Sequence, residues 1–164
     1  MKHTISALVE NKFGVLARVA GMFSGRGFNI ETLNVGPMPC GKYSRITVTL
    51  SGTEDTIKQC IGQLSKLINV IEVKDFSELG SFVSRELVIA RVQCTKETRG
   101  QLIEIADLFR SKVIDVYNDS LVIECTGNPT KIAAFLSMIE SYGIIEMART
   151  GNVSLERGIN LAKK

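Results

Sequence analysis

The stretch that decides the fold is residues 4–23, TISALVENKFGVLARVAGMF, where the apolar pattern changes from that of a strand to that of a helix. Residues 4–10 form a short apolar run, which is typical of a largely buried strand. After a polar loop, apolar side chains recur at the spacing of one helix face: Val15, Leu16, Val19, Met22 and Phe23. The chain therefore begins with a strand that runs through a short loop into an amphipathic helix.

The segments that follow complete a unit of strands and helices. The first helix is expected to end near residues 25–27, where glycine can take the left-handed backbone conformation. Thr53 is a plausible cap for a second helix, whose apolar face runs from Ile57 to Ile68. Further strands are predicted over residues 28–35, 45–50 and 70–76. This order is a split βαβ unit, which folds as an antiparallel sheet with two helices on one face.

The second half repeats this plan. The apolar pattern predicts strands over residues 87–94, 113–116, 121–125 and 144–147 and a helix over 102–109. Asn128 is expected to cap a further helix that has Pro129 at its first position, where the missing N–H costs nothing. The repeat indicates two modules with the same topology.

We predict an α+β fold with two tandem ferredoxin-like βαββαβ modules, residues 1–77 and 85–164, joined by a linker at residues 78–84. The helices can cover only one face of each sheet. Apolar side chains on the strands suggest that both faces need cover: Ile5, Ala7 and Val9 in the first module, Leu87 and Ile89 in the second. We therefore expect sheet-to-sheet or edge-to-edge dimers.

Composition excludes several classes of protein. The net charge is +3, and basic and acidic residues are interspersed, which predicts no nucleic-acid partner and no membrane-binding patch. The cysteines, Cys40, Cys60, Cys94 and Cys125, form no Cys-x-x-Cys pair and are expected to be reduced. No segment resembles a secretory signal or a membrane span. We expect a soluble cytoplasmic protein.

Catalytic and metal-binding patterns are missing from the sequence. His3 is the single histidine, and no His, Cys and Asp cluster has metal-ligand spacing, so we predict no metal site and no catalytic residues. An RNA-binding domain of this topology would carry aromatic side chains on its central strands, and residues 45–50 have none. An acylphosphatase-type enzyme would need a glycine-rich loop that ends in arginine, which the first loop is not. The chain is therefore expected to be a sensor and not an enzyme.

The loop between the first strand and the first helix is the candidate site. A helix N-terminus offers free backbone N–H groups and partial positive charge to a carboxylate. Gly14 would allow a ligand to approach these amides, and the Asn11 side chain can both donate and accept hydrogen bonds. These features suit the carboxylate and ammonium of an amino acid. The alternative is purely structural: Asn11 caps the turn and Gly14 eases it.

At these residues the sequence resembles a known family. A strand, Asn-x-x-Gly-Val-Leu and a helix at the start of a βαββαβ unit look like an ACT domain, a regulatory amino-acid-binding module. The longer motifs are similar to the small regulatory subunit of acetohydroxyacid synthase (acetolactate synthase): ENKFGVLARV (10–19), FSGRGFNIETL (23–33), IDV (114–116), EMARTG (146–151) and Arg157-Gly158. The resemblance covers essentially the full length and makes the second module ACT-like too.

The resemblance implies a role in branched-chain amino-acid biosynthesis. The small subunit activates a catalytic subunit, which is expected to carry thiamine diphosphate, Mg and FAD, and confers feedback inhibition by valine. The small subunit itself carries no cofactor. The alternative is a two-module ACT regulator of another amino-acid pathway, such as a transcriptional regulator.

The resemblance also implies where valine binds, at the interface of a homodimer formed through the ACT domains. By motif position, one chain would contribute Asn11, Gly14, Val15 and Leu16, and the other would contribute Asn29, Ile30 and Val35. Position 17 is alanine where relatives often carry serine, a change that could alter sensitivity to valine. After Cys94 the second module has no asparagine at the corresponding place, so no second valine site is expected.

Overall fold

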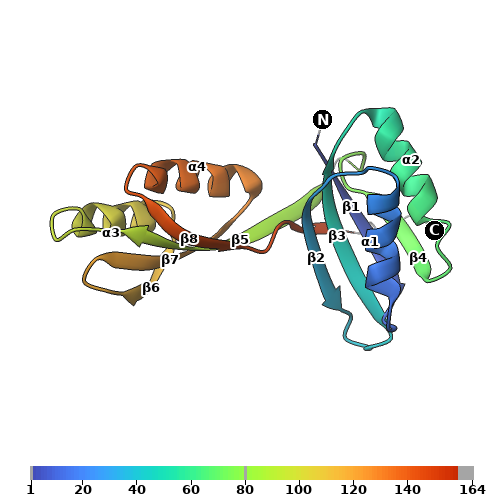
Figure 1. The fold of residues 1–164 in the computed structure, drawn as a ribbon, viewed down its shortest axis with the longest axis horizontal. Helices are drawn as coiled ribbons and strands as arrows, with labels where there is room; N and C mark the ends of the chain where they lie inside the picture. The colour runs from blue at the N-terminus through green and yellow to red at the C-terminus, as the bar shows by residue number, and fades with distance from the viewer. Residues whose placement is uncertain (1, 80, 159–164) are drawn as a thin grey trace. The chain divides into compact units, whose positions relative to one another are not determined.

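The computed structural model describes residues 2–79 and 81–158 (Figure 1). The chain divides into two compact units. The first contains the described residues up to Val83 together with those from Gly151 onward, and the second is Ser84–Thr150. The chain thus leaves the first unit once and returns to it at its C-terminal end.

The first unit is a four-stranded antiparallel sheet with two helices. The elements are β1 (Lys2–Glu10), α1 (Val15–Gly25), β2 (Ile30–Pro37), β3 (Tyr43–Ser51), α2 (Glu54–Leu64) and β4 (Val70–Asp75). The strand order is β2-β3-β1-β4, so β2 and β4 are the sheet edges. Alternate residues of the central strands pack against the helices in one core, which includes Ile5, Val48 and Phe23.

The second unit repeats this topology. Its elements are β5 (Phe82–Gln93, whose first residues belong to the first unit), α3 (Arg99–Leu108), β6 (Lys112–Val116), β7 (Ser120–Gly127), α4 (Pro129–Glu140) and β8 (Ile144–Arg149). The strand order β6-β7-β5-β8 corresponds to that of the first sheet. The core includes Val88, Ile123 and Phe135, and Phe109 packs edge to face on Phe135. The predicted α+β fold with two ferredoxin-like βαββαβ modules is confirmed.

The capping residues in the sequence correctly predicted where α2 and α4 begin. Thr53 caps α2 by accepting a hydrogen bond from the N–H of Thr56, and Asn128 caps α4 with Pro129 at its first position. The prediction was wrong at the end of α2, which stops at Leu64. Ile68 was expected on the apolar helix face, but it lies in the following turn and is exposed.

The observed strands begin and end at other residues than the sequence pattern predicted, because their lengths depend on pairing with strands that are distant in the sequence. β2 begins at Ile30 instead of residue 28 and continues to Pro37, because it pairs with β3 as far as Ser44. β5 begins at Phe82. A short strand that the sequence pattern did not predict, β9 (Val153–Glu156), pairs with β5. The backbone N–H of Arg157 donates to the carbonyl of Ser81 close to this pairing.

The helix-free face of the first sheet is polar, which corrects the expectation of apolar side chains on both faces. Ile5, Ala7 and Val9 all belong to the core beneath the helices. Most of the residues that alternate with them and with the β3 core residues bear hydroxyl groups, with Leu8 on β1 and Arg45 on β3 as exceptions. Ser6 and Thr49 are buried, with 1% and 0% of their surface exposed. In the second unit, Ile89 does lie outside the core and is exposed, as expected.

Candidate functional site

The effector loop, residues 11–16, links β1 to α1 and begins with a backbone that favours glycine. Gly14 occupies the N-cap position of α1 with φ +80° and ψ −7°, in the left-handed region, and no side chain caps the helix. A methyl group at Gly14 would meet no other atom within 4 Å. Glycine is therefore favoured here by its backbone angles and not by crowding. The first turn of α1 lacks both a capping side chain and an acidic residue. The Val15 N–H donates to the Lys12 carbonyl over 3.3 Å, so an anion here would meet the amides that follow it.

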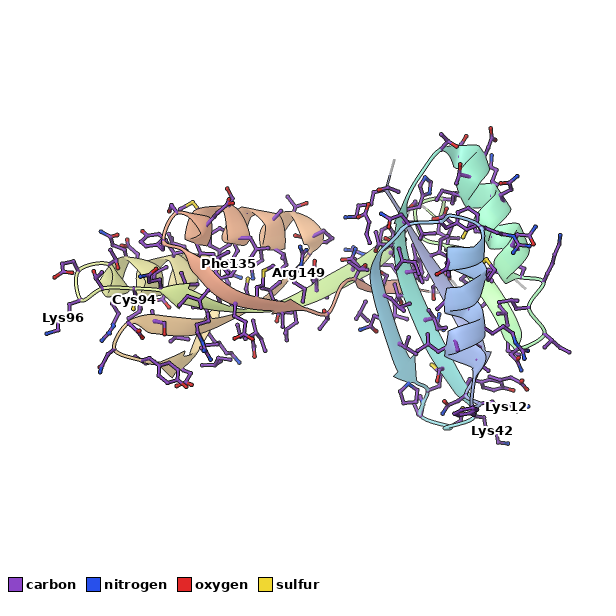
Figure 2. The ribbon with its side chains drawn as sticks, in the orientation of Figure 1. Lys12, Lys42, Cys94, Lys96, Phe135 and Arg149 are labelled. Atoms are coloured by element: carbon purple, nitrogen blue, oxygen red, sulfur yellow. The ribbon has the colours of Figure 1, made fainter. Side chains whose placement is uncertain are left out.

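Asn11 does not cap α1, but its side chain has a structural contact with the neighbouring hairpin. Its side-chain Nδ2 donates to the carbonyl of Gly41 over 3.0 Å, and its backbone N–H donates to the carbonyl of Lys42 over 2.9 Å. Both acceptors lie in the loop between β2 and β3. Figure 2 shows the side chains of Lys12 and Lys42 at the same end of the unit. Asn11 thus ties the effector loop to this hairpin, while its Oδ1 can still accept a hydrogen bond.

A polar network holds the end of β1 beside the start of α1. Glu10 accepts from Lys12 Nζ at 2.9 Å and from Asn69 Nδ2 at 2.5 Å. Arg18 Nη1 in turn donates to Asn69 Oδ1 at 2.9 Å. The hydrogen bonds from Lys12 and then Asn69 lower the pKa of the Glu10 carboxyl below its usual range. The positively charged side chains of Lys12 and Arg18 therefore lie beside the loop and are held by Glu10 and Asn69. This arrangement suits a ligand that carries a carboxylate.

The predicted effector residues fall into two groups by burial. Val15 is 5% exposed and belongs to the core, and Ile30 is half-buried against the same core. Both side chains therefore contribute to the core of the first unit. Leu16 and Val35 are exposed, at 43% and 41%, and Asn29 is exposed as well. Residues of this second group are available to a ligand.

A single chain brings only part of the predicted set together. Val35 lies toward the end of the sheet where Glu10 pairs with Tyr43, which is also the end that carries the effector loop. Ile30 pairs with Leu50 at the opposite end. Five residues of strand separate Ile30 from Val35, roughly 17 Å. Asn29 and Ile30 therefore lie far from the effector loop of their own chain.

The corresponding loop of the second unit is closed by its own side chains. The N–H of Thr95 donates to Thr98 Oγ1 at 2.8 Å, and the N–H of Thr98 donates to Thr95 Oγ1 at 3.3 Å. Arg99 Nη2 donates to the carbonyls of Tyr117 and Asn118, at 3.0 and 2.8 Å, in the turn between β6 and β7. An arginine thus makes the link between loop and hairpin that Asn11 makes in the first unit.

Three residues that support the loop were not identified from the sequence. Gly41 and Lys42 act through backbone carbonyls, which leave no signal in residue type. Asn69 precedes β4 and contacts Glu10 and Arg18, which flank the loop, because β4 pairs with β1. Their positions depend on strand pairing, which local patterns do not encode.

The described residues offer little other site chemistry. Within residues 2–79 and 81–158, no group of three or more His, Cys, Asp or Glu side chains is placed to hold a metal ion. Across the same residues, no helix is long and apolar enough to cross a membrane. The four cysteines are free thiols; Cys40 is exposed and the others are buried. Burial raises the pKa of the Cys60 thiol to about 11, which makes it unreactive.

Two ferredoxin-like modules, the first with an open glycine loop at a helix N-terminus, define a tandem ACT-domain protein. Family models agree with this class and refine it. A model of the AHAS small subunit-like ACT domain matches residues 5–72, and a model of the small subunit of acetolactate synthase matches residues 85–158. The chain belongs to the family of acetolactate synthase small subunits, as its motifs predicted.

Individual relatives match over nearly the whole chain. A probable acetolactate synthase small subunit of Archaeoglobus fulgidus is 49% identical, over 96% of this chain and 98% of the relative. The small subunit of Mycolicibacterium smegmatis is 50% identical, over 95% of this chain and 91% of the relative. The crystal structure of the small subunit from Thermotoga maritima superposes with a TM-score of 0.85 at 34% identity, covering 97% and 99% of the two chains.

Proposed function

We propose that this chain binds the catalytic subunit of acetohydroxyacid synthase, raises its activity and makes it sensitive to inhibition by valine. Membership in the small-subunit family supports the partner and argues against a regulator of another pathway. The catalytic chemistry, with thiamine diphosphate, Mg and FAD, would belong to the partner. The observation that carries the proposal of an effector is the uncapped start of α1 at Gly14, beside Asn11.

We propose further that two first modules form the valine site together, through antiparallel pairing of their β2 strands. β2 is a sheet edge, and its exposed residues include Leu33 and Val35. A two-fold axis through such a pair reverses the second strand. Asn29 and Ile30 of one chain would then lie beside the effector loop of the other. This arrangement supplies the residues that a single chain keeps roughly 17 Å apart.

Within this site the chain's own groups have distinct roles. The amides at the start of α1 would hold the valine carboxylate, with Lys12 adding positive charge nearby. Asn11 Oδ1 would accept from the ammonium group while Nδ2 remains on Gly41. The exposed Leu16 and the partner's aliphatic side chains would surround the isopropyl group. One methylene more or less changes binding by about 1–3 kcal/mol, so leucine and isoleucine should bind more weakly.

Reconstitution with a purified catalytic subunit tests the function. We expect addition of the chain to increase acetolactate formation and valine to reverse the increase. Leu33→Asp on the β2 edge should abolish the valine response, because a carboxylate would be placed in the proposed dimer contact. Ile71→Asp, which changes an exposed apolar residue on the opposite edge strand β4 (55% exposed, against 37% for Leu33), should leave it intact. No change in rate on mixing would refute the regulatory role, and equal behaviour of the two variants would refute the β2 pairing.

A further inference from the structure

The residues that follow β8 form a strap, residues 151–156, on the helix-free face of the first sheet. Asn152 and Ser154 are buried, with 8% and 1% of their surface exposed, whereas Val153 and Leu155 between and beyond them are exposed. This alternation indicates an extended segment with one face against the protein. Gly151 begins the strap with φ +74°. Gly151 is also the last residue of the EMARTG motif. This motif has no role in the proposed effector site.

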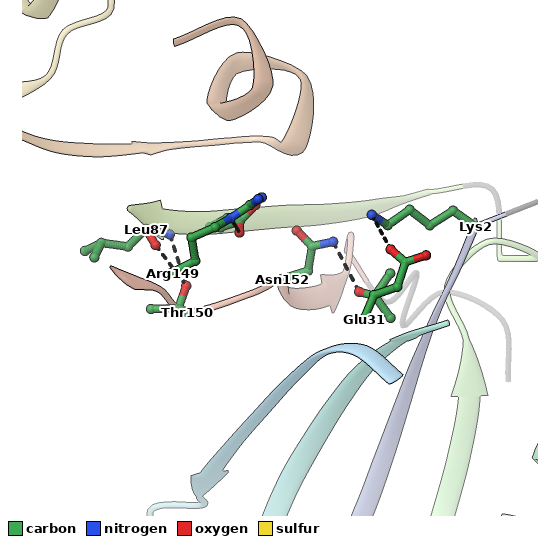
Figure 3. A network of polar contacts seen from close by, with 8 residues as sticks. Lys2, Glu31, Leu87, Arg149, Thr150 and Asn152 are labelled. Carbon is green, nitrogen blue, oxygen red and sulfur yellow. Dashed lines mark hydrogen bonds and ion pairs between the residues drawn. The ribbon is translucent and has the colours of Figure 1, made fainter. Parts of the chain in front are cut away.

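The strap contacts two strands of the sheet. A methyl group on Gly151 would lie 2.6 Å from Cβ of Thr32 on β2, so this position admits only glycine without movement. Asn152 Nδ2 donates to Oγ1 of Thr49 on β3 over 3.4 Å (Figure 3). Near its end, Glu156 pairs with Lys74 of β4 at 3.1 Å. The strap therefore lies directly on β2, the strand that carries the proposed effector and dimer contacts.

The contact is polar and only weakly stabilising. The strap's contacts with β2 and β3 are made by hydroxyl, amide and glycine groups, which remove little apolar surface from water. Residues 153–156 are held in addition by pairing with β5 and by the exposed ion pair of Glu156 with Lys74. Among the described residues, Thr32 Oγ1 and Asn152 Oδ1 are buried without a hydrogen-bond partner. The net stabilisation from an intramolecular hydrogen bond is small, and a buried polar atom without a partner costs at least as much free energy as one such bond contributes. Docking of the strap is thus finely balanced and can respond to a small change in β2.

The residues just before the strap are fixed in the second unit. Arg149 makes a two-point ion pair with the buried Glu86, at 2.8 and 3.0 Å (Figure 3). The backbone N–H of Leu87 donates to Thr150 Oγ1 at 3.1 Å. The chain passes from one unit to the other between Thr150 and Gly151. A change at Gly151 is therefore transmitted along a short covalent path to a well-anchored point of the second module.

We propose that docking of the strap on Thr32 and Thr49 is coupled to effector binding and links the effector site to the second module. This inference rests on the proposed valine site. Valine held between two chains would fix β2, and a fixed β2 would favour the docked strap. Linkage is reciprocal, so loss of docking must weaken valine binding by the same factor by which valine promotes docking.

Hydrogen–deuterium exchange of the full-length chain, with and without valine, tests the coupling. We expect valine to slow exchange in residues 151–156 by about 5-fold or more, the lower limit of ordinary allosteric coupling. Exchange in the turn between β6 and β7 should not change. Gly151→Ala should undock the strap and weaken valine binding by a similar factor. Gly158→Ala is the matched control, because Gly158 also has a positive φ, +39°, but has open space around it.

The outcomes separate this inference from the proposed function. Calorimetry first establishes whether wild-type protein binds valine. If valine binds but exchange in the strap is unchanged, the coupling is wrong and the valine site stands. If valine does not bind, both proposals fail. A strap with a merely structural role would lower the melting temperature in Gly151→Ala without any valine-dependent protection in the wild type.

Discussion

The loops that begin α1 and α3 occupy equivalent places in two modules of the same fold, yet one is open and the other is closed. In the second module, threonine hydroxyls pair with the loop amides and Arg99 binds the neighbouring turn. Neither α1 nor α3 has a side chain that caps its first turn, but in the first module Gly14 precedes the helix and Asn11 joins the loop to the hairpin by an exposed side chain. The fold therefore does not require an open loop. The open loop distinguishes the first module from the second, and this difference supports its proposed role as the effector site.

The largest expected effect comes from placing negative charge in the open loop. Gly14→Asp should weaken valine binding by about 100-fold or more, since juxtaposed like charges cost several kcal/mol. Gly14→Asn is the control, because asparagine has nearly the same shape and tolerates left-handed backbone about as well. We expect Gly14→Asn to weaken valine binding much less. Calorimetric titration of both variants measures the difference. Equal affinities would show that the valine carboxylate does not bind at the start of α1.

Removing the Asn11 amide should have the next largest effect. Asn11→Ala deletes the proposed acceptor for the ammonium group and the tie to Gly41. A hydrogen bond to a charged group contributes about 1.5–3 kcal/mol, so affinity should fall by about 10- to 100-fold. The same titration checks it, and wild-type affinity in this variant would favour the purely structural interpretation of the loop.

The corresponding change in the closed loop should affect stability and not valine binding. Arg99→Ala removes two charge-assisted hydrogen bonds to the β6–β7 turn, which should lower the free energy of unfolding by about 1–3 kcal/mol. Valine affinity should stay within about 2-fold of wild type, because both hydrogen bonds of Arg99 lie within the second unit and share no partner with the proposed site. Thermal unfolding and calorimetry measure the two quantities. A marked loss of affinity would mean that the second module takes part in the site.

The smallest effect concerns two carboxyl groups, one at each loop. The pKa of Glu10 is lowered first by its hydrogen bond from Lys12, whereas that of Glu97 is lowered first by the Thr95 hydroxyl. Added salt should therefore raise the pKa of Glu10 toward its ordinary value and leave that of Glu97 nearly unchanged. Titration by NMR at two ionic strengths checks this, and equal salt responses would argue against the Lys12 pair.

The same shifts fix the sign of a pH effect. Because the pKa of Glu10 is lower in the folded chain than in the unfolded one, its interactions stabilise the fold above the unfolded pKa. This stabilisation is lost as the pH falls through the folded pKa. We expect the order of the effector loop, followed by amide chemical shifts, to decline in that acidic range.

Much of the fold could be predicted because its signals are local. Residues 4–23 contain both a strand pattern and a helix pattern, and Asn128-Pro129 specifies a helix start by itself. β9 was missed because a short alternating segment becomes a strand only through a partner that is distant in sequence. The end of α2 was misplaced because apolar residues in a turn, such as Leu67, can pack on the core as helix residues do.

The candidate site was less predictable for a physical reason. Val15 and Ile30 are apolar whether they contact a ligand or the core, and only packing separates the two roles. Gly41 and Lys42 contribute backbone carbonyls, and such contacts cannot be predicted from the residue type. The proposed division of the site between two chains depends on pairing of an edge strand, which the geometry of one chain suggests but its sequence does not.

A complementation titration tests the shared valine site most directly. Asn11→Ala and Asn29→Ala chains, each alone, should bind valine poorly because every site in their dimers lacks one asparagine. Unfolding and refolding them together should produce mixed dimers with one intact site, and about one quarter of the wild-type sites should return with wild-type affinity. Failure of the mixture to regain any tight binding, or normal binding by either variant alone, would contradict a site formed by Asn11 of one chain and Asn29 of the other.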